Sequence, residues 1–258
     1  MIRVAVKIAY LGDDFFGSQI QPGMKTVEGD ILSDLEKICD LNEDAIDLRL
    51  ASRTDRGVNA LGNVAVLNSN IDDPETLLKA LNSISKSIFY RSFAVVDETF
   101  NPRHAALRKY RYIIPSKGLN LERMRTCAQL FVGEHDLVRF CKSEGKTTVI
   151  TVDDISVTAD EHMVTMDFSA RYYLWNMIRR ISAALISVGR GDSEITDVKC
   201  ALEGQDLTFG LARADALTLT DVVYPDMDFL TPSKNMMVQR IEEENFRNCI
   251  KNRFFESL

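Results

Sequence analysis

Cysteine and histidine are scarce in this sequence, and they are not grouped as metal ligands would be. The chain of 258 residues contains five cysteines and three histidines, and no two cysteines form a C-x-x-C pair. An odd number of widely spaced cysteines argues against a disulfide framework and against a zinc site, so we expect free thiols. The composition therefore gives no reason to expect a metal enzyme.

Long apolar runs are also absent. No segment is apolar over the length needed to cross a bilayer, and the N-terminus leads directly into a strand pattern without a secretory hydrophobic region. We therefore expect a cytoplasmic protein with no membrane contact. The chain is 45% hydrophobic and has six prolines, which is typical of a globular protein with a large core.

The net charge of −7 at first argues against nucleic acid as a partner. However, residues 100–117 and 171–190 carry only basic charges, five and four respectively, so the rest of the chain carries −16. One such segment would be interpreted as an ordinary solvated surface. Two of them, both beside the motifs described below, favour a groove that binds a polyanion.

Hydrophobic periodicity predicts strands and helices in a similar order in both halves of the chain. The first half is expected to contain strands over 3–10, 45–51, 63–68 and 88–97, with helices over 27–39 and from Pro74 onward. The second half is expected to contain strands over 108–114, 149–158, 162–169 and 215–223, with helices over 121–132, 172–189, 194–203 and 235–253.

This order predicts an α+β fold made of two ferredoxin-like halves, with a mixed, mostly antiparallel sheet and an active-site cleft between them. We place the boundary near residue 105. The N-terminal domain would then be residues 1–105 and the C-terminal domain residues 106–258. No low-complexity segment or flexible linker marks the boundary in the sequence.

The segment from Ala51 to Gly62 contains a carboxylate between two guanidinium groups. Asp55 is flanked by Arg53 and Arg56, in a turn that follows an expected strand. Flanking positive charge lowers the pKa of a carboxyl group, and an ionised aspartate in a dry site is a competent nucleophile. The alternative is a surface turn with a local ion pair, and charge alone favours it because such pairs are common and weak.

Aromatic and basic residues are interleaved from Phe100 to Tyr112. Bases stack on aromatic rings and phosphates pair with arginine or lysine, so Tyr110 and its basic neighbours suit RNA. The basic candidates are Arg103, Arg108, Lys109 and Arg111. Tyr110 and Tyr112 would share one strand face, and we expect one of the two rings simply to pack in the core.

The segment from Arg171 to Arg180 is expected to belong to a helix whose buried face includes Trp175 and Ile178. Arg179 and Arg180 cannot both lie on that face. An arginine beside a buried face is commonly an extended surface residue, but it can also reach a carboxylate across a cleft between domains.

Together these segments resemble the TruA family of tRNA pseudouridine synthases, its archaeal members in particular. Residues 53–62 (RTDRGVNALG) are similar to the family's catalytic signature, and residues 10–21 (YLGDDFFGSQIQ) to its N-terminal motif. Residues 100–112 and 177–179 resemble its second and third motifs. The motifs occur in the family's order over nearly the whole chain.

Three single positions depart from the bacterial pattern of that family. Ser18 stands where a tryptophan is usual, and Asn59 where a histidine is usual. Arg56 replaces a small residue, and this change is more similar to archaeal and eukaryotic members, as are residues 174–177.

The resemblance implies an isomerase that converts uridine to pseudouridine in tRNA without a metal or cofactor. Asp55 would attack the uridine either at C6 of the base or at C1′ of the ribose. Tyr110 would stack on the flipped base and take part in removing the C5 proton, and Arg179 would pair with Asp55. Other substrate contacts would come from Arg53, Arg56, Arg103, Arg108, Lys109, Arg111 and Arg180. The implied substrate is the anticodon arm, commonly positions 38 to 40, and the implied assembly is a homodimer.

Two other functions stay open at this point. A catalytically silent tRNA-binding protein would need the same basic and aromatic segments, but it would not need to keep Asp55, Tyr110 and Arg179 together. A different enzyme on a ferredoxin-like scaffold would need a motif of its own. The sequence contains no P-loop, no zinc-ligand spacing and no G-x-G-x-x-G to support one.

Overall fold

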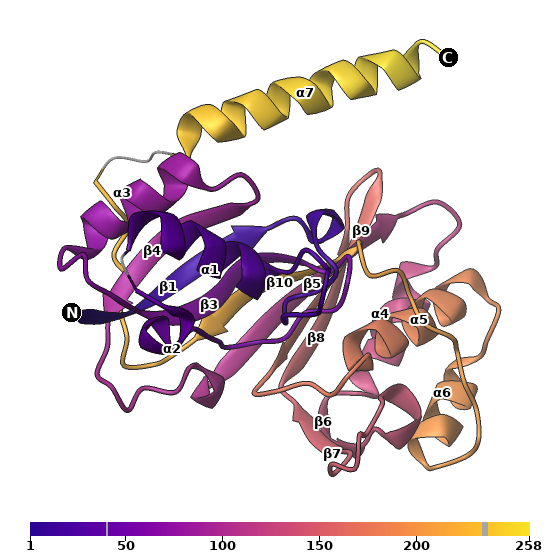
Figure 1. Ribbon diagram of the computed structural model, residues 1–258. Coiled ribbons are helices and arrows are strands. Elements are labelled where there is room, and N and C mark those ends of the chain that lie inside the picture. Colours follow the sequence, from indigo (N-terminus) through magenta and orange to yellow (C-terminus); the bar gives the residue numbers. More distant parts are fainter. Residues whose placement is uncertain (40, 234–236) are drawn as a thin grey trace.

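One mixed sheet of eight strands runs through the molecule (Figure 1). The computed structural model describes residues 1–39, 41–233 and 237–258. The order of strands along the sheet is β4 (Ile88–Val95), β1 (Ile2–Tyr10), β3 (Asn59–Ser69), β10 (Leu217–Val223), β5 (Leu107–Pro115), β9 (Met163–Ala170) and β8 (Asp154–Ala159). The short strand β2 (Arg49–Leu50) pairs with β3 beside this path.

The N-terminal part of the sheet has the ferredoxin-like order β4-β1-β3-β2, and its helices are α1 (Val27–Ile38) and α3 (Pro74–Ile84). Both helices begin where the sequence supplies a cap. The Thr26 side chain accepts a hydrogen bond from the Gly29 N–H, and the Asp73 side chain accepts one from the Thr76 N–H. A 3-10 turn, Gly12–Asp14, follows β1.

The C-terminal part repeats this arrangement with the order β10-β5-β9-β8. Its helices are α4 (Leu121–Gln129), α5 (Met177–Arg190) and α6 (Ile195–Leu202), and two 3-10 turns lie at Pro102–His104 and Val138–Phe140. The two parts join where β10 pairs in parallel with β3, while the other ladders described for this sheet are antiparallel. The predicted fold is therefore confirmed. The domain boundary near residue 105 falls just before β5 and stays a prediction.

Three local predictions were wrong. The expected strand over 45–51 is a short helix, α2 (Glu43–Ile46), followed by the two residues of β2. The Asn42 side chain caps α2 by accepting from the Ala45 N–H, and Asp47 ends it with a left-handed φ of 43°. The expected strand over 149–158 is two strands: β7 (Val149–Val152) pairs with an unexpected β6 (Gly133–Asp136) in a separate small sheet, and β8 joins the main sheet. The helix expected from residue 172 begins only at Met177.

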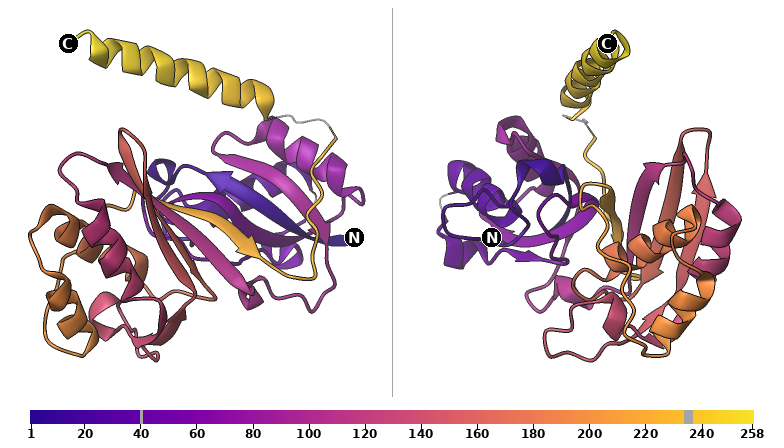
Figure 2. Two further views of the ribbon diagram at one scale, coloured as in Figure 1. Left: turned by 180° about the vertical axis from the view of Figure 1, so that it is seen from behind. Right: turned by 90° about the vertical axis from the view of Figure 1, so that its right-hand side faces the viewer.

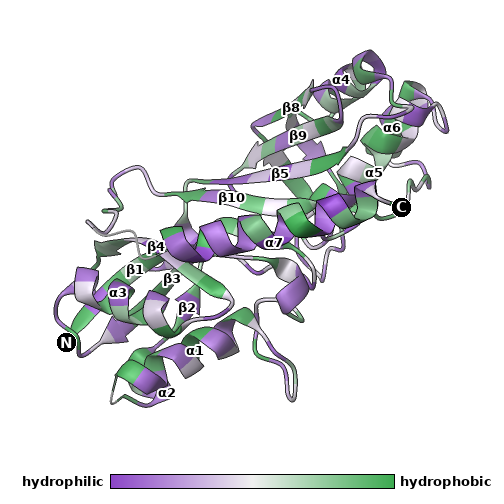
Figure 3. Cartoon of the chain, turned by 90° about the horizontal axis from the view of Figure 1, so that it is seen from above, coloured by the Kyte–Doolittle hydropathy of each residue, from purple (hydrophilic) through white to green (hydrophobic). Residues whose placement is uncertain are grey.

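A hydrophobic core extends through both parts and includes buried residues of the strands and of α1, α3, α4 and α5. The last helix, α7 (Val238–Glu256), stands apart from this body, as both views of Figure 2 show. Hydrophobic and hydrophilic residues alternate along it in Figure 3. Arg240 ties its first turn to the sheet, with its guanidinium 3.7 Å from the centre of the Phe89 ring. The helix was expected over 235–253, of which 235 and 236 lie outside the described residues.

Candidate active site

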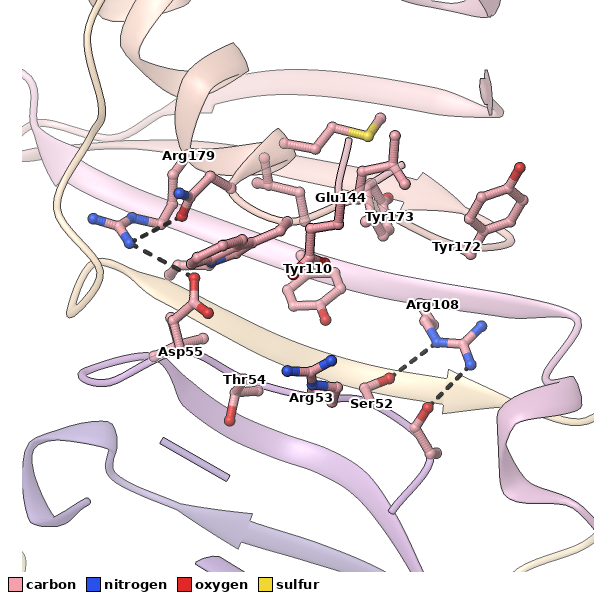
Figure 4. Close-up of a pocket in the computed structure, with 18 of the residues that line it drawn as sticks. Ser52, Arg53, Thr54, Asp55, Arg108, Tyr110, Glu144, Tyr172, Tyr173 and Arg179 are labelled. Atoms are coloured by element: carbon pink, nitrogen blue, oxygen red, sulfur yellow. Dashed lines mark hydrogen bonds and ion pairs between the residues drawn. The ribbon is translucent and has the colours of Figure 1, made fainter. Parts of the chain in front are cut away.

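A pocket of about 800 Å³ lies between the two parts of the molecule (Figure 4). The N-terminal part contributes the loop from Leu50 to Val58, and the C-terminal part contributes Tyr110 and residues 172–179. A third segment, residues 144–147, lines the pocket from the loop that precedes β7. The volume is within the range of about 300–1,000 Å³ that is common for ligand pockets. The expected cleft between the halves is present.

The loop that carries Asp55 is braced by the N-terminal motif. Ser18 and Thr54 exchange two hydrogen bonds, from Ser18 N to Thr54 O at 3.0 Å and from Thr54 N to Ser18 Oγ at 2.9 Å. The hydroxyls of Thr54 and Tyr10 lie 2.9 Å apart. Gly12 permits close packing, because a Cβ atom there would lie 2.3 Å from the backbone of Gly57.

Asp55 and Arg179 face each other across the pocket. Arg179 NH1 lies 3.8 Å from Asp55 Oδ2, and 38% of the Asp55 side chain is exposed against 17% for Arg179. The guanidinium is held in place from the C-terminal part: its Nε–H donates to the Ala212 carbonyl at 2.8 Å, and NH1 lies 3.4 Å from the Asn176 side-chain oxygen. The predicted pairing of the two residues is therefore present in the geometry.

The pKa of Asp55 is raised from its ordinary value, whereas the sequence suggested that it would be lowered. Burial of the carboxyl group is the largest effect, and it outweighs the lowering by Arg179, by the Trp175 indole N–H and by Arg53. Glu144 adds a smaller increase. Arg56 does not act on Asp55 as expected, because its guanidinium lies 4.3 Å from the centre of the Phe16 ring.

The two tyrosines of β5 have different environments although they share a strand face. Tyr110 lines the pocket and packs edge-on against Tyr173, with ring centres 5.2 Å apart. Both rings are buried in the core, Tyr110 with 7% and Tyr112 with 1% of its surface exposed, but Tyr112 is not among the pocket-lining residues, so it is the ring that simply packs. Burial raises the pKa of Tyr112 to about 12 and raises that of Tyr110 as well. Tyr110 therefore enters any reaction near neutral pH as a neutral phenol.

The basic residues chosen from the sequence separate into two groups. Arg53, Arg103 and Arg108 line the pocket, as does Arg179. Lys109 and Arg111 lie on the opposite face of β5, because successive side chains of a strand alternate between faces. Arg111 instead forms a two-fold contact with Asp167, at 2.8 and 3.1 Å.

Arg108 is buried, with 8% of its surface exposed. Its guanidinium donates to Ser52 Oγ at 3.0 Å and to the carbonyls of Ala51 and Arg103 at 3.1 and 2.9 Å. It therefore ties the loop that carries Asp55 to β5 rather than presenting free donors to a substrate. Arg180 also differs from the expectation, because it lies outside the pocket lining and NH1 is 3.4 Å from the Arg139 carbonyl.

Glu144, Lys146 and Trp175 line the pocket but were not among the site residues expected from the sequence. Trp175 was assigned to a buried helical face, but it is 41% exposed and lies in the turn before α5. Asn176 was the available signal, since asparagine tolerates left-handed backbone and here has a φ of 61°. Lys146 and Glu144 lie in a loop with no motif, which left no local signal.

The relatives of this chain fit the site. The sequence profile of a family described as tRNA pseudouridine synthase matches residues 127–225. The chain is 37% identical over 257 residues to tRNA pseudouridine synthase A of Pyrococcus abyssi, covering 96% of this chain and 95% of the relative. This chain belongs to the tRNA pseudouridine synthase A family. As a member of the TruA family it is an enzyme of the isomerase class, and the predicted family is confirmed.

A second relative and one solved structure are also similar to this chain. The chain is 35% identical over 264 residues to tRNA pseudouridine synthase A of Pyrococcus horikoshii, covering 100% of this chain and 95% of the relative. One solved structure, described as the crystal structure of the archaeal box H/ACA sRNP Nop10-Cbf5 complex, aligns with 71% of this chain and 43% of that chain. The identity in that alignment is 12% and the TM-score 0.35.

No group of three or more histidine, cysteine, aspartate or glutamate residues within the described ranges is arranged to hold a metal ion. Among the helices that the structure describes, none has both the length and the apolar character needed to span a membrane.

Proposed function

We propose that the protein isomerises uridine to pseudouridine in the anticodon arm of tRNA, among positions 38 to 40, with Asp55 as the nucleophile. The observation that carries this proposal is the Asp55–Arg179 pair, 3.8 Å apart in a pocket between the two parts of a chain from the pseudouridine synthase family. Arg179 orients the carboxylate and favours its ionised form, which is the form that attacks.

The reaction balances without a cofactor. The Asp55 carboxylate attacks C1′ of the ribose or C6 of the base, and the N1–C1′ bond of the uridine breaks. The detached uracil turns so that C5 bonds to C1′, and the Asp55 carboxylate is released. C5 loses its proton, N1 gains one, and the product is an isomer of the substrate.

Tyr110 supports the flipped base in this scheme. Its ring lies beside the Asp55–Arg179 pair in Figure 4, and a neutral phenol can stack on a base and donate a hydrogen bond. Its raised pKa argues against a tyrosinate as the group that takes the C5 proton. The released Asp55 carboxylate is the better acceptor, because it has just left C1′ or C6, and both of these atoms are bonded to C5 after the new bond forms.

The charge of the pocket supports a polyanion substrate in spite of the acidic chain. The lining contains five cationic side chains and two carboxylates. The cations are Arg53, Arg103, Arg108, Lys146 and Arg179, and the acids are Asp55 and Glu144. Arg53 and Arg103 are exposed and present free donors to phosphates, which makes them the main backbone contacts in this proposal.

The remaining parts of the proposal come from the family. We infer a homodimer in the cytoplasm whose protomers both line the RNA groove, with a domain boundary near residue 105. Light scattering of the purified protein tests the dimer, for which a mass of one protomer would be the contrary result.

Release of tritium from tRNA labelled at uracil C5, with no methyl donor present, tests the reaction, because the C5 hydrogen is lost when pseudouridine forms. We expect release with the wild-type protein and none with Asp55→Asn. Binding of tRNA without release from any tRNA would identify a silent binding protein instead. Appreciable release by Asp55→Asn would remove Asp55 as the nucleophile. Mapping pseudouridine in tRNA from cells with and without the protein tests positions 38 to 40.

A further inference from the structure

A tight turn precedes α5, and two neighbouring side chains of this turn lie toward Asp55 and Arg179. The Met177 N–H donates to the Leu174 carbonyl at 3.0 Å, which closes the turn over Trp175 and Asn176. Asn176 has φ 61° and ψ 5°, the conformation that the third residue of a type II turn requires. The Asn176 side chain faces Arg179, and the Trp175 side chain faces Asp55.

Trp175 and Asp55 line the same pocket, and an interaction with the indole N–H, the single polar group of the Trp175 side chain, lowers the pKa of Asp55. The Arg179 ion pair, at 3.8 Å, is longer than a hydrogen bond and does not by itself fix the direction of the carboxylate. A neutral donor can therefore fix the carboxylate without adding a charge that would also attract phosphate groups.

The indole ring is itself held by the loop that precedes β7. Lys142 Nζ lies 4.0 Å from the centre of the Trp175 ring, within the range of a cation–π contact. The Lys142 N–H donates to the Trp175 carbonyl at 2.8 Å, so backbone and side chain of the two residues are both in contact. Trp175 is 41% exposed at the pocket edge, and burial alone does not explain a tryptophan in this place.

We propose that Trp175 is a positioning residue for Asp55: its indole N–H orients the carboxylate, and Lys142 fixes the ring that carries this N–H. The inference rests on the proposed function of Asp55. It assigns a role to a residue outside the Asp55, Tyr110 and Arg179 set.

The charged groups that face Asp55 come from three segments, and each is left intact by a change at Trp175. They are Arg179 of α5, Arg53 of the same loop and Glu144 of the loop before β7. Removing the N–H donor takes away a contact that favours the ionised carboxylate, so the pKa of Asp55 rises further. In the pH profile of kcat/KM, the acid limb, where activity falls as Asp55 becomes protonated, must then move to higher pH.

The test compares Trp175→Phe, which keeps an aromatic ring without a donor, with Trp175→Gln, which keeps a donor without the ring. Tritium release is measured as a function of pH. With Trp175→Phe we expect kcat to fall about tenfold and the acid limb to move up by about one pH unit, the effect of losing one hydrogen bond to a charged group. With Trp175→Gln we expect the limb to stay nearer its wild-type place. Lys142→Met should shift the limb in the same direction as Trp175→Phe, but less.

The proposal is overturned if the acid limb of the pH profile of Trp175→Phe stays at its wild-type position. Equal losses of kcat in the Phe and Gln variants with both limbs unmoved also overturn it, because that pattern indicates packing alone. Circular dichroism and thermal unfolding confirm that each variant folds. Failure of the proposed function is distinguishable, since the wild-type protein would then release no tritium, or Asp55→Asn would release it.

Discussion

Ser18 and Thr54 are bound to each other through two hydrogen bonds, one in each direction, at 3.0 and 2.9 Å. Thr54 directly precedes Asp55, so this contact fixes the backbone from which the proposed nucleophile projects. Ser18 is 1% exposed, and its hydroxyl accepts the Thr54 N–H in a place that water does not reach. The serine that departs from the bacterial pattern is thus a brace of the loop that carries Asp55.

Ser18→Ala should weaken both the fold and the reaction. The Thr54 N–H would lose its acceptor, and an unsatisfied buried donor costs about 1–3 kcal/mol in the free energy of unfolding. Denaturant unfolding measures this loss, and tritium release measures the accompanying fall in kcat. Ser83→Ala is the matched control: Ser83 is exposed on α3, and its change should alter stability by less than about 0.5 kcal/mol. Equal stabilities of the two variants would contradict the brace.

Arg108 and Arg111 should lose very different amounts of stability on the same substitution, although they are three residues apart in one basic segment. Arg108→Ala removes hydrogen bonds to Ser52 and to three carbonyls, and we expect a loss of at least about 2 kcal/mol in the free energy of unfolding. Arg111→Ala removes an exposed pair with Asp167, worth about 0–1 kcal/mol. Urea unfolding measures both losses, and a larger loss for Arg111→Ala would be inconsistent with the strand alternation described above.

Local signals in the sequence predicted most of the elements. Thr26 and Asp73 are side-chain caps, and α1 and α3 begin directly after them, as expected. Alternation of apolar residues likewise located β1 and β5 to within a residue or two. These features could be predicted because their causes lie within a few residues of each other along the chain.

Features that depend on distant contacts could not be predicted. The pairing of Thr218 with Asn59 joins the two halves into one sheet, and no local pattern specifies a parallel partner so far away in the sequence. The raised pKa of Asp55 has the same origin, because burial by both halves outweighs the arginines that flank it. Trp175 was expected on a buried helical face because the helical periodicity of α5 was extended toward the N-terminus beyond Asn176, where the backbone turns.

Trp175 is the single tryptophan of the chain, so fluorescence excited and recorded at tryptophan wavelengths reports on the pocket edge. We expect tRNA to change the emission intensity on binding, because a base or phosphate reaching Asp55 must pass the exposed indole. Titration of Asp55→Asn with tRNA measures this change without turnover. Filter binding under the same conditions supplies an independent binding curve. Saturable binding with unchanged emission would show that the RNA does not reach this part of the pocket.

Asp55→Asn should stabilise the fold at neutral pH while abolishing turnover. Burial raises the pKa of Asp55 in the folded protein, so its ionised form is better solvated in the unfolded chain. The cost to stability is complete above the folded-state pKa and disappears below the unfolded value of about 3.9. We therefore expect a higher Tm for Asp55→Asn than for the wild-type protein at pH 7, with the difference shrinking toward pH 4.

The control for this comparison is Asp226→Asn, a change at an exposed aspartate after β10 that should leave Tm unaltered across the same range. Differential scanning calorimetry of the three proteins at several pH values gives the comparison directly. A lower Tm for Asp55→Asn at pH 7 would mean that the Arg179 pair stabilises the fold by more than the burial of Asp55 costs. In that case the Asp55 carboxylate and Arg179 would form a structural ion pair. A higher Tm is instead what a nucleophile held ready at the expense of stability requires.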